Sequence, residues 1–227
     1  MVRLTKRYCE EEAWLDDEIL CEPVARTDAA APTADKLTLE QFRESISSCK
    51  KCALGKTRIN MVFGSGSPSA RLMFVGEGPG YDEDRQGEPF VGRAGQLLTK
   101  IIESIGMKRS DVYIANTVKC HPMIDPLNSD KRGNDRPPAP EEIAQCLPYL
   151  EKQIAIIRPK CICCLGTWAS RTLLATETPI GKLRGRFYDY HGIPLLPTYH
   201  PAALLRNPAL KKDVWQDMKM LKAALDS

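Results

Sequence analysis

The segment "GEGPGYDEDRQGEPFVGRAGQLL", residues 76–98, gathers many of the residues of this chain that are suited to chemistry. It follows the apolar run "RLMFV" and leads into a helix-like pattern, so it is expected to be a loop between a strand and a helix. Its glycines allow the backbone to approach a ligand closely, because glycine has no side chain. Phe90 adds an aromatic face, and the acidic side chains add carboxylates. This composition predicts a ligand-binding loop.

Two further polar side chains stand at the ends of apolar runs. Asn116 begins "NTVKC", and His200 lies in "TYHP". The amide of Asn116 offers both a hydrogen-bond donor and an acceptor. A competing interpretation is that Asn116 only caps the turn that follows its strand.

Four cysteines have the types and spacing of a metal or cluster site. Cys49 and Cys52 form "CKKC", Cys120 ends a predicted strand, and Cys146 lies in the helix-like "PEEIAQCLPYL". Four thiolates suit a tetrahedral zinc ion or an iron–sulfur cluster. The wide separation of Cys120 and Cys146 favours a cluster buried against a domain over a compact zinc knuckle. The alternative is that these two cysteines are small buried hydrophobic residues.

The remaining cysteines of the nine in the chain are assigned no ligand role. Cys161, Cys163 and Cys164 belong to an apolar run and are expected to pack in the core. Cys9 and Cys21 lie in the N-terminal segment, where no structural role is expected.

Short apolar runs alternate with helical patterns along the chain, and these elements must position the candidate residues. The expected strands are 71–76, 111–118, 160–166 and 193–200, and the expected helices are 92–105, 139–157, 167–175 and 208–226. This alternation predicts an α/β fold, a three-layer αβα sandwich with a central, mainly parallel, four-stranded sheet. Ligands of such sheets bind beyond the carboxyl ends of the strands, where the loop, Asn116 and His200 are expected to meet.

Composition indicates one folded domain with an appended segment. The chain has 227 residues, 43% of them hydrophobic, and a formal net charge of +3, which permits a nucleic-acid partner without arguing for one. Residues 1–36 end in an Ala/Pro/Thr/Asp stretch and are expected to be a poorly ordered extension of the domain at 37–227. A helix is expected after Thr38, which can cap it together with Gln41. No run has the length of a membrane span and no signal peptide is evident, so a cytoplasmic location and no membrane partner are expected.

The assembled motifs resemble those of the family 4 uracil-DNA glycosylases, the type that carries an iron–sulfur cluster. The resemblance rests on "GEGPGYDEDRQGEPFVGRAGQLL", "NTVKCHP", "NDRPPAPEEIAQC" and "TYHPAALLRNP", and it covers roughly residues 38–226. It implies that the four cysteines that we have singled out, Cys49, Cys52, Cys120 and Cys146, hold a [4Fe–4S] cluster. We expect this cluster to have a structural role.

The resemblance also implies roles for the site residues. Phe90 would stack on a uracil flipped out of DNA, and Asn116 would recognise its edge. Glu77 and Gly78 resemble the wall that excludes thymine. His200 would stabilise the departing base.

Catalysis also needs a carboxylate near the sugar. Glu83 resembles the residue that orients water, with its neighbours Asp82 and Asp84 as rivals for that role.

Other residues are expected to contact the DNA around the flipped base. Lys119 and Arg206 would neutralise phosphates. Leu204 and Leu205 would fill the gap that the base leaves, although a buried helix face is the competing interpretation for both leucines.

The function implied is that of a monomeric uracil-DNA glycosylase of base excision repair, acting on uracil-containing DNA, single- or double-stranded. One alternative is a noncatalytic iron–sulfur module that binds DNA or senses redox state. Another is a covalent binder of the family X type, which the lack of an Arg-rich, His-bearing insertion in "EDRQGEPFVGRAG" disfavours.

Overall fold

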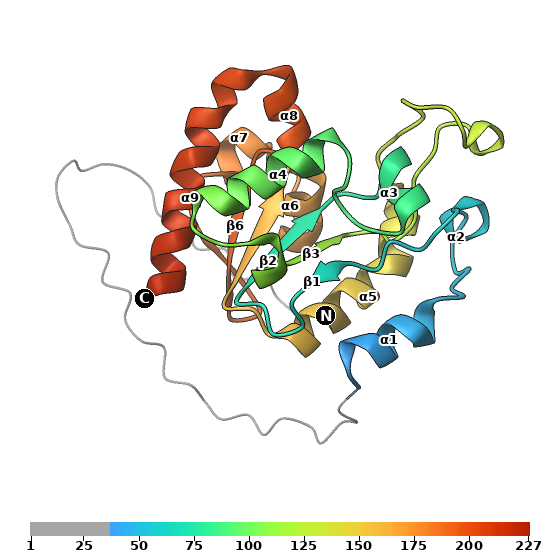
Figure 1. Cartoon of the computed structure of the whole chain (residues 1–227), viewed down its shortest axis with the longest axis horizontal. Helices are drawn as coiled ribbons and strands as arrows, with labels where there is room; N and C mark the ends of the chain where they lie inside the picture. Colours follow the sequence, from blue (N-terminus) through green and yellow to red (C-terminus); the bar gives the residue numbers. More distant parts are fainter. Residues whose placement is uncertain (1–36) are drawn as a thin grey trace, which may run out of the picture. The chain divides into compact units, whose positions relative to one another are not determined.

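The computed structural model describes residues 37–227, which form a six-stranded sheet with helices on both faces (Figure 1). The order of the strands across the sheet is β1-β3-β2-β4-β6-β5. The strands are β1 (Ser65–Gly66), β2 (Leu72–Gly76), β3 (Tyr113–Asn116), β4 (Cys161–Leu165), β5 (Tyr188–Tyr190) and β6 (Ile193–Thr198). The four inner strands are parallel, and β1 and β5 add antiparallel edges.

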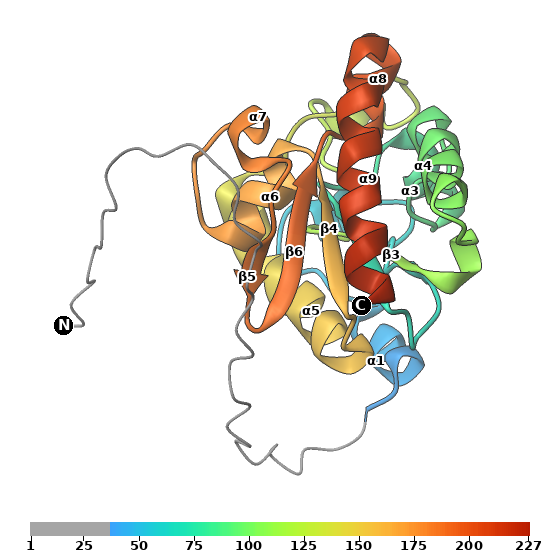
Figure 2. The ribbon, with the colours of Figure 1, turned by 90° about the vertical axis from the view of Figure 1, so that its left-hand side faces the viewer.

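The helices connect and cover these strands. They are α1 (Leu39–Ile46), α2 (Leu54–Thr57), α3 (Tyr81–Gln86), α4 (Arg93–Ser104), α5 (Pro140–Ile157), α6 (Thr167–Leu174), α7 (Ile180–Leu183), α8 (Pro201–Arg206) and α9 (Lys211–Asp226). Three short 3₁₀ helices are η1 (Arg109–Asp111), η2 (Pro126–Asn128) and η3 (Pro208–Leu210). Helices α4 and α9 lie on one side of the sheet, and α5 and α6 lie on the other (Figure 2).

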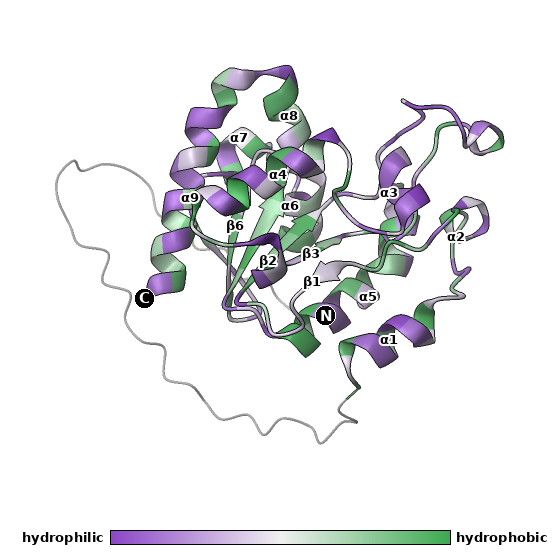
Figure 3. Cartoon of the chain, in the orientation of Figure 1, coloured by the Kyte–Doolittle hydropathy of each residue, from purple (hydrophilic) through white to green (hydrophobic). Residues whose placement is uncertain are grey.

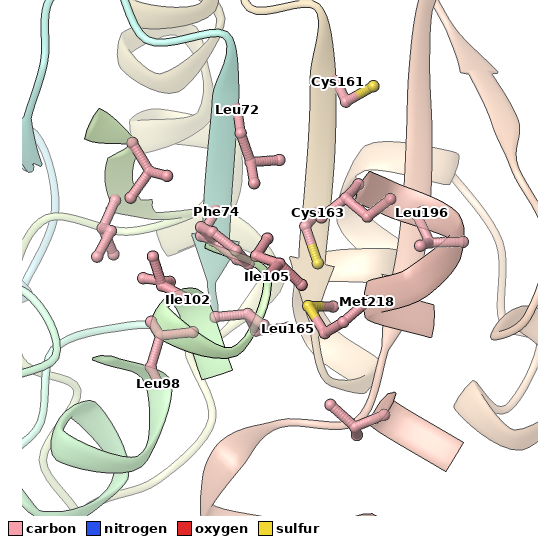
Figure 4. Packing of buried hydrophobic residues seen from close by; sticks show 14 of the residues in the cluster. Leu72, Phe74, Leu98, Ile102, Ile105, Cys161, Cys163, Leu165, Leu196 and Met218 are labelled. Carbon is pink, nitrogen blue, oxygen red and sulfur yellow. The ribbon is translucent and has the colours of Figure 1, made fainter. Parts of the chain in front are cut away.

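An apolar cluster on each face of the sheet joins the strands to the helices. Each strand contributes to both clusters, because its successive residues point to opposite faces. In β2, Leu72 and Phe74 pack with α4 and α9, whereas Met73 and Val75 pack with α5 and α6. Figure 4 shows Phe74, Leu98, Ile102, Cys163 and Met218 within the first cluster, which joins β2, β4, α4 and α9. The hydropathy colouring agrees: the inner strands are mostly apolar, whereas the helices alternate between apolar and polar residues (Figure 3).

The order of the parallel strands locates the ligand-binding edge. The chain runs from β2 out to β3 and then crosses back over β2 to β4, so the direction of winding reverses between β2 and β4. Ligands of open α/β sheets bind at such a reversal, beyond the carboxyl ends of the strands. Residues that follow β2, β3, β4 and β6 therefore share one edge.

The predicted α/β class, the four parallel strands and the predicted helices are confirmed. Thr38 and Gln41 form the capping box of α1. The prediction missed β1 and β5, which are only two and three residues long and carry no apolar alternation. Strand β5 pairs with β6 through a tight turn at His191 and Gly192, both with positive φ, as a type I′ turn requires.

One local expectation was wrong. The segment after β2 is not a loop throughout, because it contains helix α3, whose first turn carries the acidic residues that the sequence assigned to the loop. None of the helices between residues 37 and 227 combines the length and apolar character needed to cross a bilayer. The expected N-terminal extension, residues 1–36 with Cys9 and Cys21, lies outside the described residues.

Candidate active site

A cavity of about 500 Å³ opens at the carboxyl ends of the parallel strands. It collects most of the candidate residues from segments that are far apart in the sequence. The predicted site residues that line it are Glu77, Gly78, Glu83, Phe90, Asn116, His200 and Arg206. The rule that strand ends share one edge thus accounts for the meeting of these candidate residues in one cavity.

Phe90 is held in a strained backbone conformation, with φ at 53°. Two glycines make this possible. A Cβ atom on Gly95 would lie 1.8 Å from the Phe90 carbonyl oxygen, and one on Gly76 would lie 2.5 Å from the ring atom Cζ. The same Cβ on Gly76 would also lie 2.4 Å from Oδ1 of Asn116. Because Gly76 and Gly95 have no side chains, the Phe90 ring and the Asn116 side-chain amide can both lie close to the end of β2.

Asn116 is the last residue of β3 and is almost fully buried. Its Oδ1 atom has no hydrogen-bond partner among residues 37–227, although it is buried. An unpaired buried amide oxygen typically costs about 1–3 kcal/mol, so its presence in a cavity wall calls for an explanation. The oxygen is an acceptor available to a ligand that brings its own donor.

His200 caps helix α8 in a defined protonation state. Its Nδ1 accepts a hydrogen bond from the Ala202 amide at 3.1 Å, which requires that Nδ1 carry no proton. Burial, together with the smaller effect of the positive charge of Arg206, lowers the pKa of His200 to about 4. The imidazole is therefore neutral at pH 7, with its proton on Nε2. The ring lies 5.5 Å from the Phe90 ring, centroid to centroid.

The Glu83 carboxylate accepts hydrogen bonds from backbone amides that precede and follow Phe90 in the sequence. Its Oε1 accepts hydrogen bonds from the amides of Val91 at 3.0 Å and Gly92 at 3.1 Å, and its Oε2 accepts one from Gly80 at 3.2 Å. These bonds hold the carboxylate against the cavity and brace the loop that carries Phe90.

The two rivals of Glu83 are occupied elsewhere. Asp82 pairs with Arg132 at 2.8 Å, and Asp84 is buried, where it accepts hydrogen bonds from the amides of Ile59 and Asn60. Of the three acidic neighbours, only Glu83 lines the cavity.

A further pair of acidic groups lies in the cavity wall. Burial, together with the smaller effect of the negative charge of Asp135, raises the pKa of Glu77 to about 7. Asp135 also lines the cavity and accepts a hydrogen bond from Nε2 of the buried His121 at 2.6 Å. The sequence analysis did not predict Asp135 and His121 as site residues. Asp135 lies in "NDRPP", whose polar residues and prolines are typical of an ordinary loop.

Two predicted DNA contacts are wrong. Lys119 is 1% exposed; its Nζ donates to the Asn116 carbonyl at 2.8 Å and to Gln153 at 2.6 Å, so it cannot reach a phosphate. It supports the Asn116 backbone instead, and burial lowers its pKa to about 8. Leu204 is 2% exposed and packs in the core, as the competing interpretation held, whereas Leu205 is 42% exposed beside Arg206.

The four candidate ligand cysteines also come together. Cys49, Cys52, Cys120 and Cys146 line one small cavity, although no three Cys, His, Asp or Glu side chains of residues 37–227 converge closely enough to hold a single metal ion. Ligands of a cluster lie further apart than those of one ion, because iron and sulfide atoms lie between them. Four cysteine thiolates around one cavity are a donor set that an iron–sulfur cluster accepts.

Hydrogen-bond donors also lie next to these sulfur atoms. Nη1 of Arg58 lies 3.0 Å from Sγ of Cys120, and the hydroxyl of Tyr149 lies 3.3 Å from Sγ of Cys49. Such donors stabilise thiolate ligands of a cluster. The other cysteines of the described residues, Cys161, Cys163 and Cys164, pack in the two core clusters as predicted.

Comparison with known proteins places this geometry in a family. A family model described as "Uracil DNA glycosylase superfamily" matches residues 63–219. The chain is 43% identical over 194 residues to a type-4 uracil-DNA glycosylase of Sulfurisphaera tokodaii, covering 82% of this chain and 84% of that protein. It is 42% identical over 192 residues to the type-4 enzyme of Archaeoglobus fulgidus, covering 81% and 92%. For the type-4 enzyme of Thermotoga maritima, the identity is 41% over 189 residues, covering 82% and 93%.

Proposed function

This chain belongs to the uracil DNA glycosylase superfamily and to its type-4 branch, and from that premise we propose that it excises uracil from DNA. The reaction is hydrolysis of the N-glycosidic bond, which leaves an abasic site for base excision repair. The observation that carries this proposal is the unpaired buried Oδ1 of Asn116, in a cavity that also holds the Phe90 ring and a neutral His200.

Recognition of uracil follows from the shape and polarity of this cavity. A base within the duplex stack is inaccessible, so the enzyme flips it into a pocket, where Phe90 stacks on its face. Stacking does not discriminate between bases. Asn116 discriminates, because its Oδ1 accepts from uracil N3–H and its Nδ2 donates to O4, whereas cytosine presents the opposite pattern. Glu77 and Gly78 form the wall that faces C5 and leaves no room for the methyl group of thymine.

Bond cleavage places negative charge on the leaving uracil and positive charge on the sugar. The Nε2–H of His200 donates to uracil O2 and stabilises the first charge. Glu83 is a carboxylate at the cavity wall, suited to stabilise the positive sugar and to orient the water that attacks it. His200 stays neutral throughout, since the imidazole only donates a hydrogen bond.

The DNA around the flipped base is held by α8. Leu205 is exposed on α8 next to Arg206, which lines the cavity, so Leu205 can fill the gap left in the stack and Arg206 can pair with a phosphate. The proposed partner is uracil-containing DNA, bound by a monomer.

We further propose a [4Fe–4S] cluster held by Cys49, Cys52, Cys120 and Cys146, for which their shared cavity and the donors Arg58 and Tyr149 are the support. Bound there, the cluster supplies a structural cross-link and takes no part in base removal. It ties the segment after α1 to the segment after β3 and to α5.

Purified protein is expected to be brown and to contain about four iron and four sulfide per chain, as a [4Fe–4S] cluster requires. Cys120→Ala should lose both the colour and the solubility, because the loss of one of four ligands weakens the binding of the cluster and removes the cross-link to the segment after β3. Iron and sulfide analysis with visible absorption measures this. Cys163→Ala, in the core of β4, is the matched control and should keep the cluster. Colourless protein with one zinc ion per chain would contradict the assignment.

The proposed activity is tested by incubating the purified chain with a single-stranded oligonucleotide that carries one deoxyuridine. Alkali then cleaves the strand at any abasic site. Cleavage at the uracil position is expected, whereas matched thymidine and deoxycytidine oligonucleotides should stay intact. A noncatalytic DNA-binding or redox-sensing module would leave every strand uncut, and a covalent binder of the family X type would yield protein attached to the DNA.

A further inference from the structure

The cavity extends beyond the residues that the reaction requires. Its wall continues along the carboxyl edge of the sheet to Trp168 at the start of α6, Ile180 at the start of α7, and Tyr199 at the end of β6. From β3 to β6 this edge spans three strand spacings, roughly 14 Å at about 4.8 Å each. One pyrimidine ring on Phe90 does not fill a cavity of this width.

Trp168 stands across this edge from the DNA-contacting helix. Helix α6 packs on the α5 side of the sheet, whereas α8 packs on the opposite side through Leu204. The wall of the cavity therefore includes Trp168 from one layer and Arg206 from the other. A strand that leaves a nucleotide bound in this cavity can therefore contact residues of both layers.

The Trp168 side chain does not pack in the apolar core clusters on either face of the sheet. It is 38% exposed, while the next two residues, Ala169 and Ser170, are completely buried. Trp168 belongs to neither of the two core clusters and stacks on no other aromatic ring among residues 37–227. Part of the Trp168 surface is thus exposed in the wall of the cavity.

The backbone under Trp168 is firmly positioned. Gly166 follows β4 with φ at 89°, and a Cβ atom there would lie 2.9 Å from Cβ of His200, so the start of α6 lies directly against the catalytic histidine. The Ser170 hydroxyl donates to the Gly166 carbonyl at 2.7 Å, which fixes the first turn of the helix. An exposed aromatic ring on a rigid turn is a preorganised stacking surface.

We propose that Trp168 stacks on the base of a nucleotide adjacent to the flipped deoxyuridine. Arg206, which lines the same cavity from α8, pairs with a phosphate of the same strand. An exposed aromatic ring with a nearby cation is the combination by which proteins bind single strands without reading their sequence. This inference rests on the proposed uracil-excision function, and it adds a second base subsite to the uracil pocket.

The test uses single-stranded oligonucleotides with one deoxyuridine, in which the neighbouring nucleotides either carry their bases or are replaced by base-free tetrahydrofuran on both sides. Affinity is measured with 2′-fluoro-2′-deoxyuridine versions, which resist cleavage. Trp168→Ala should weaken binding to the base-bearing oligonucleotide by about 5- to 140-fold, the factor that corresponds to about 1–3 kcal/mol of stacking. Binding to the tetrahydrofuran-flanked oligonucleotide should change less than twofold.

Two variants serve as controls. Trp168→Phe keeps an aromatic face and should retain most of the affinity. Trp215→Ala removes an indole that is 45% exposed on α9, away from the cavity, and should not change the affinity for either oligonucleotide.

Should Trp168→Ala fail to fold, a chain with Trp14 and Trp215 changed to phenylalanine leaves Trp168 as the sole indole. Its emission should be quenched by the base-bearing oligonucleotide and not by the tetrahydrofuran-flanked one.

The outcomes separate this proposal from the function on which it rests. An equal loss of affinity for both oligonucleotides would make Trp168 a wall of the uracil pocket and would overturn the second subsite. Unchanged affinity in Trp168→Ala would overturn it as well. A wild-type chain that releases no uracil would overturn the proposed function, while the affinity measurement, which needs no cleavage, would still decide the role of Trp168.

Discussion

We expect His200→Ala to lower the single-turnover rate of uracil release by about 10²–10³-fold at saturating enzyme. The loss of one preorganised donor to a developing anion costs about 2.7–4 kcal/mol. Uracil O2 is nearly neutral before cleavage and gains charge only as the bond opens, so the hydrogen bond from His200 strengthens in the transition state. Affinity for uncleavable uracil-containing DNA should therefore change little.

The matched control is His191→Ala. His191 is exposed in the turn between β5 and β6 and does not line the cavity, so its loss should leave the rate unchanged. Rate and affinity are to be measured at one stated salt concentration, because phosphate contacts make affinity depend on salt. A His200→Ala enzyme that cleaves at the wild-type rate would refute the assignment, and a variant that only loses affinity would make His200 a binding residue.

The pKa of His200 also predicts the pH dependence. Because burial lowers this pKa from its ordinary value of 6.5 to about 4, the folded protein keeps the imidazole neutral above about pH 4. The unfolded chain takes up this proton near pH 6.5, so the stability linked to His200 is fully present above pH 6.5 and is lost as the pH falls toward 4. The cleavage rate should show no inflection from His200 between about pH 5 and pH 9. The acid sensitivity of the thermal unfolding midpoint should be smaller in His200→Ala.

Glu83→Ala is expected to reduce the single-turnover rate by a similar factor, about 10²–10³-fold, and also to destabilise the fold. The variant removes the carboxylate next to the sugar. It also leaves the amides of Gly80, Val91 and Gly92 without their acceptor, at a cost of about 1–3 kcal/mol for each amide that water cannot reach. Single-turnover kinetics beside thermal unfolding measure the two effects separately.

Neighbouring acidic residues provide the controls for Glu83. Asp82→Ala breaks an ion pair with the exposed Arg132 and should leave the rate almost unchanged. Asp84→Ala should destabilise the protein, because it removes the buried carboxylate that accepts from the amides of Ile59 and Asn60, without the same loss of rate in the folded fraction.

Glu83→Gln distinguishes support of the loop from chemistry. Its amide oxygen can still accept from Val91 and Gly92, so the variant should fold, but the negative charge is gone and the rate should remain low. A wild-type rate in Glu83→Gln would show that Glu83 only supports the backbone around Phe90 and has no role in the chemical step. If Asp82→Ala lost the activity and Glu83→Ala kept it, the carboxylate assignment would be wrong.

Much of the architecture was determined by the sequence itself. Apolar runs of strand length alternating with longer helical patterns leave a parallel sheet covered on both faces as the arrangement that buries them, and that is the observed fold. In such a sheet the carboxyl ends of the strands lie at one edge, so the order of the apolar runs alone was enough to expect Glu77, Asn116 and His200 at one site. The cap at Thr38 was also determined locally, because its hydrogen bonds reach only three residues.

Tertiary structure decided which side chains face the cavity. Leu204 and Leu205 are equivalent in sequence, but neighbours on a helix point about 100° apart, so only one of them can face the core. The packing of α8 on the sheet buries Leu204 and exposes Leu205. Lys119 turns inward because Gln153, 34 residues further along the chain, offers it an acceptor. Trp168 and Asp135 line the cavity for the same reason: only the folded chain brings α6 and the loop after β3 to the wall of one cavity.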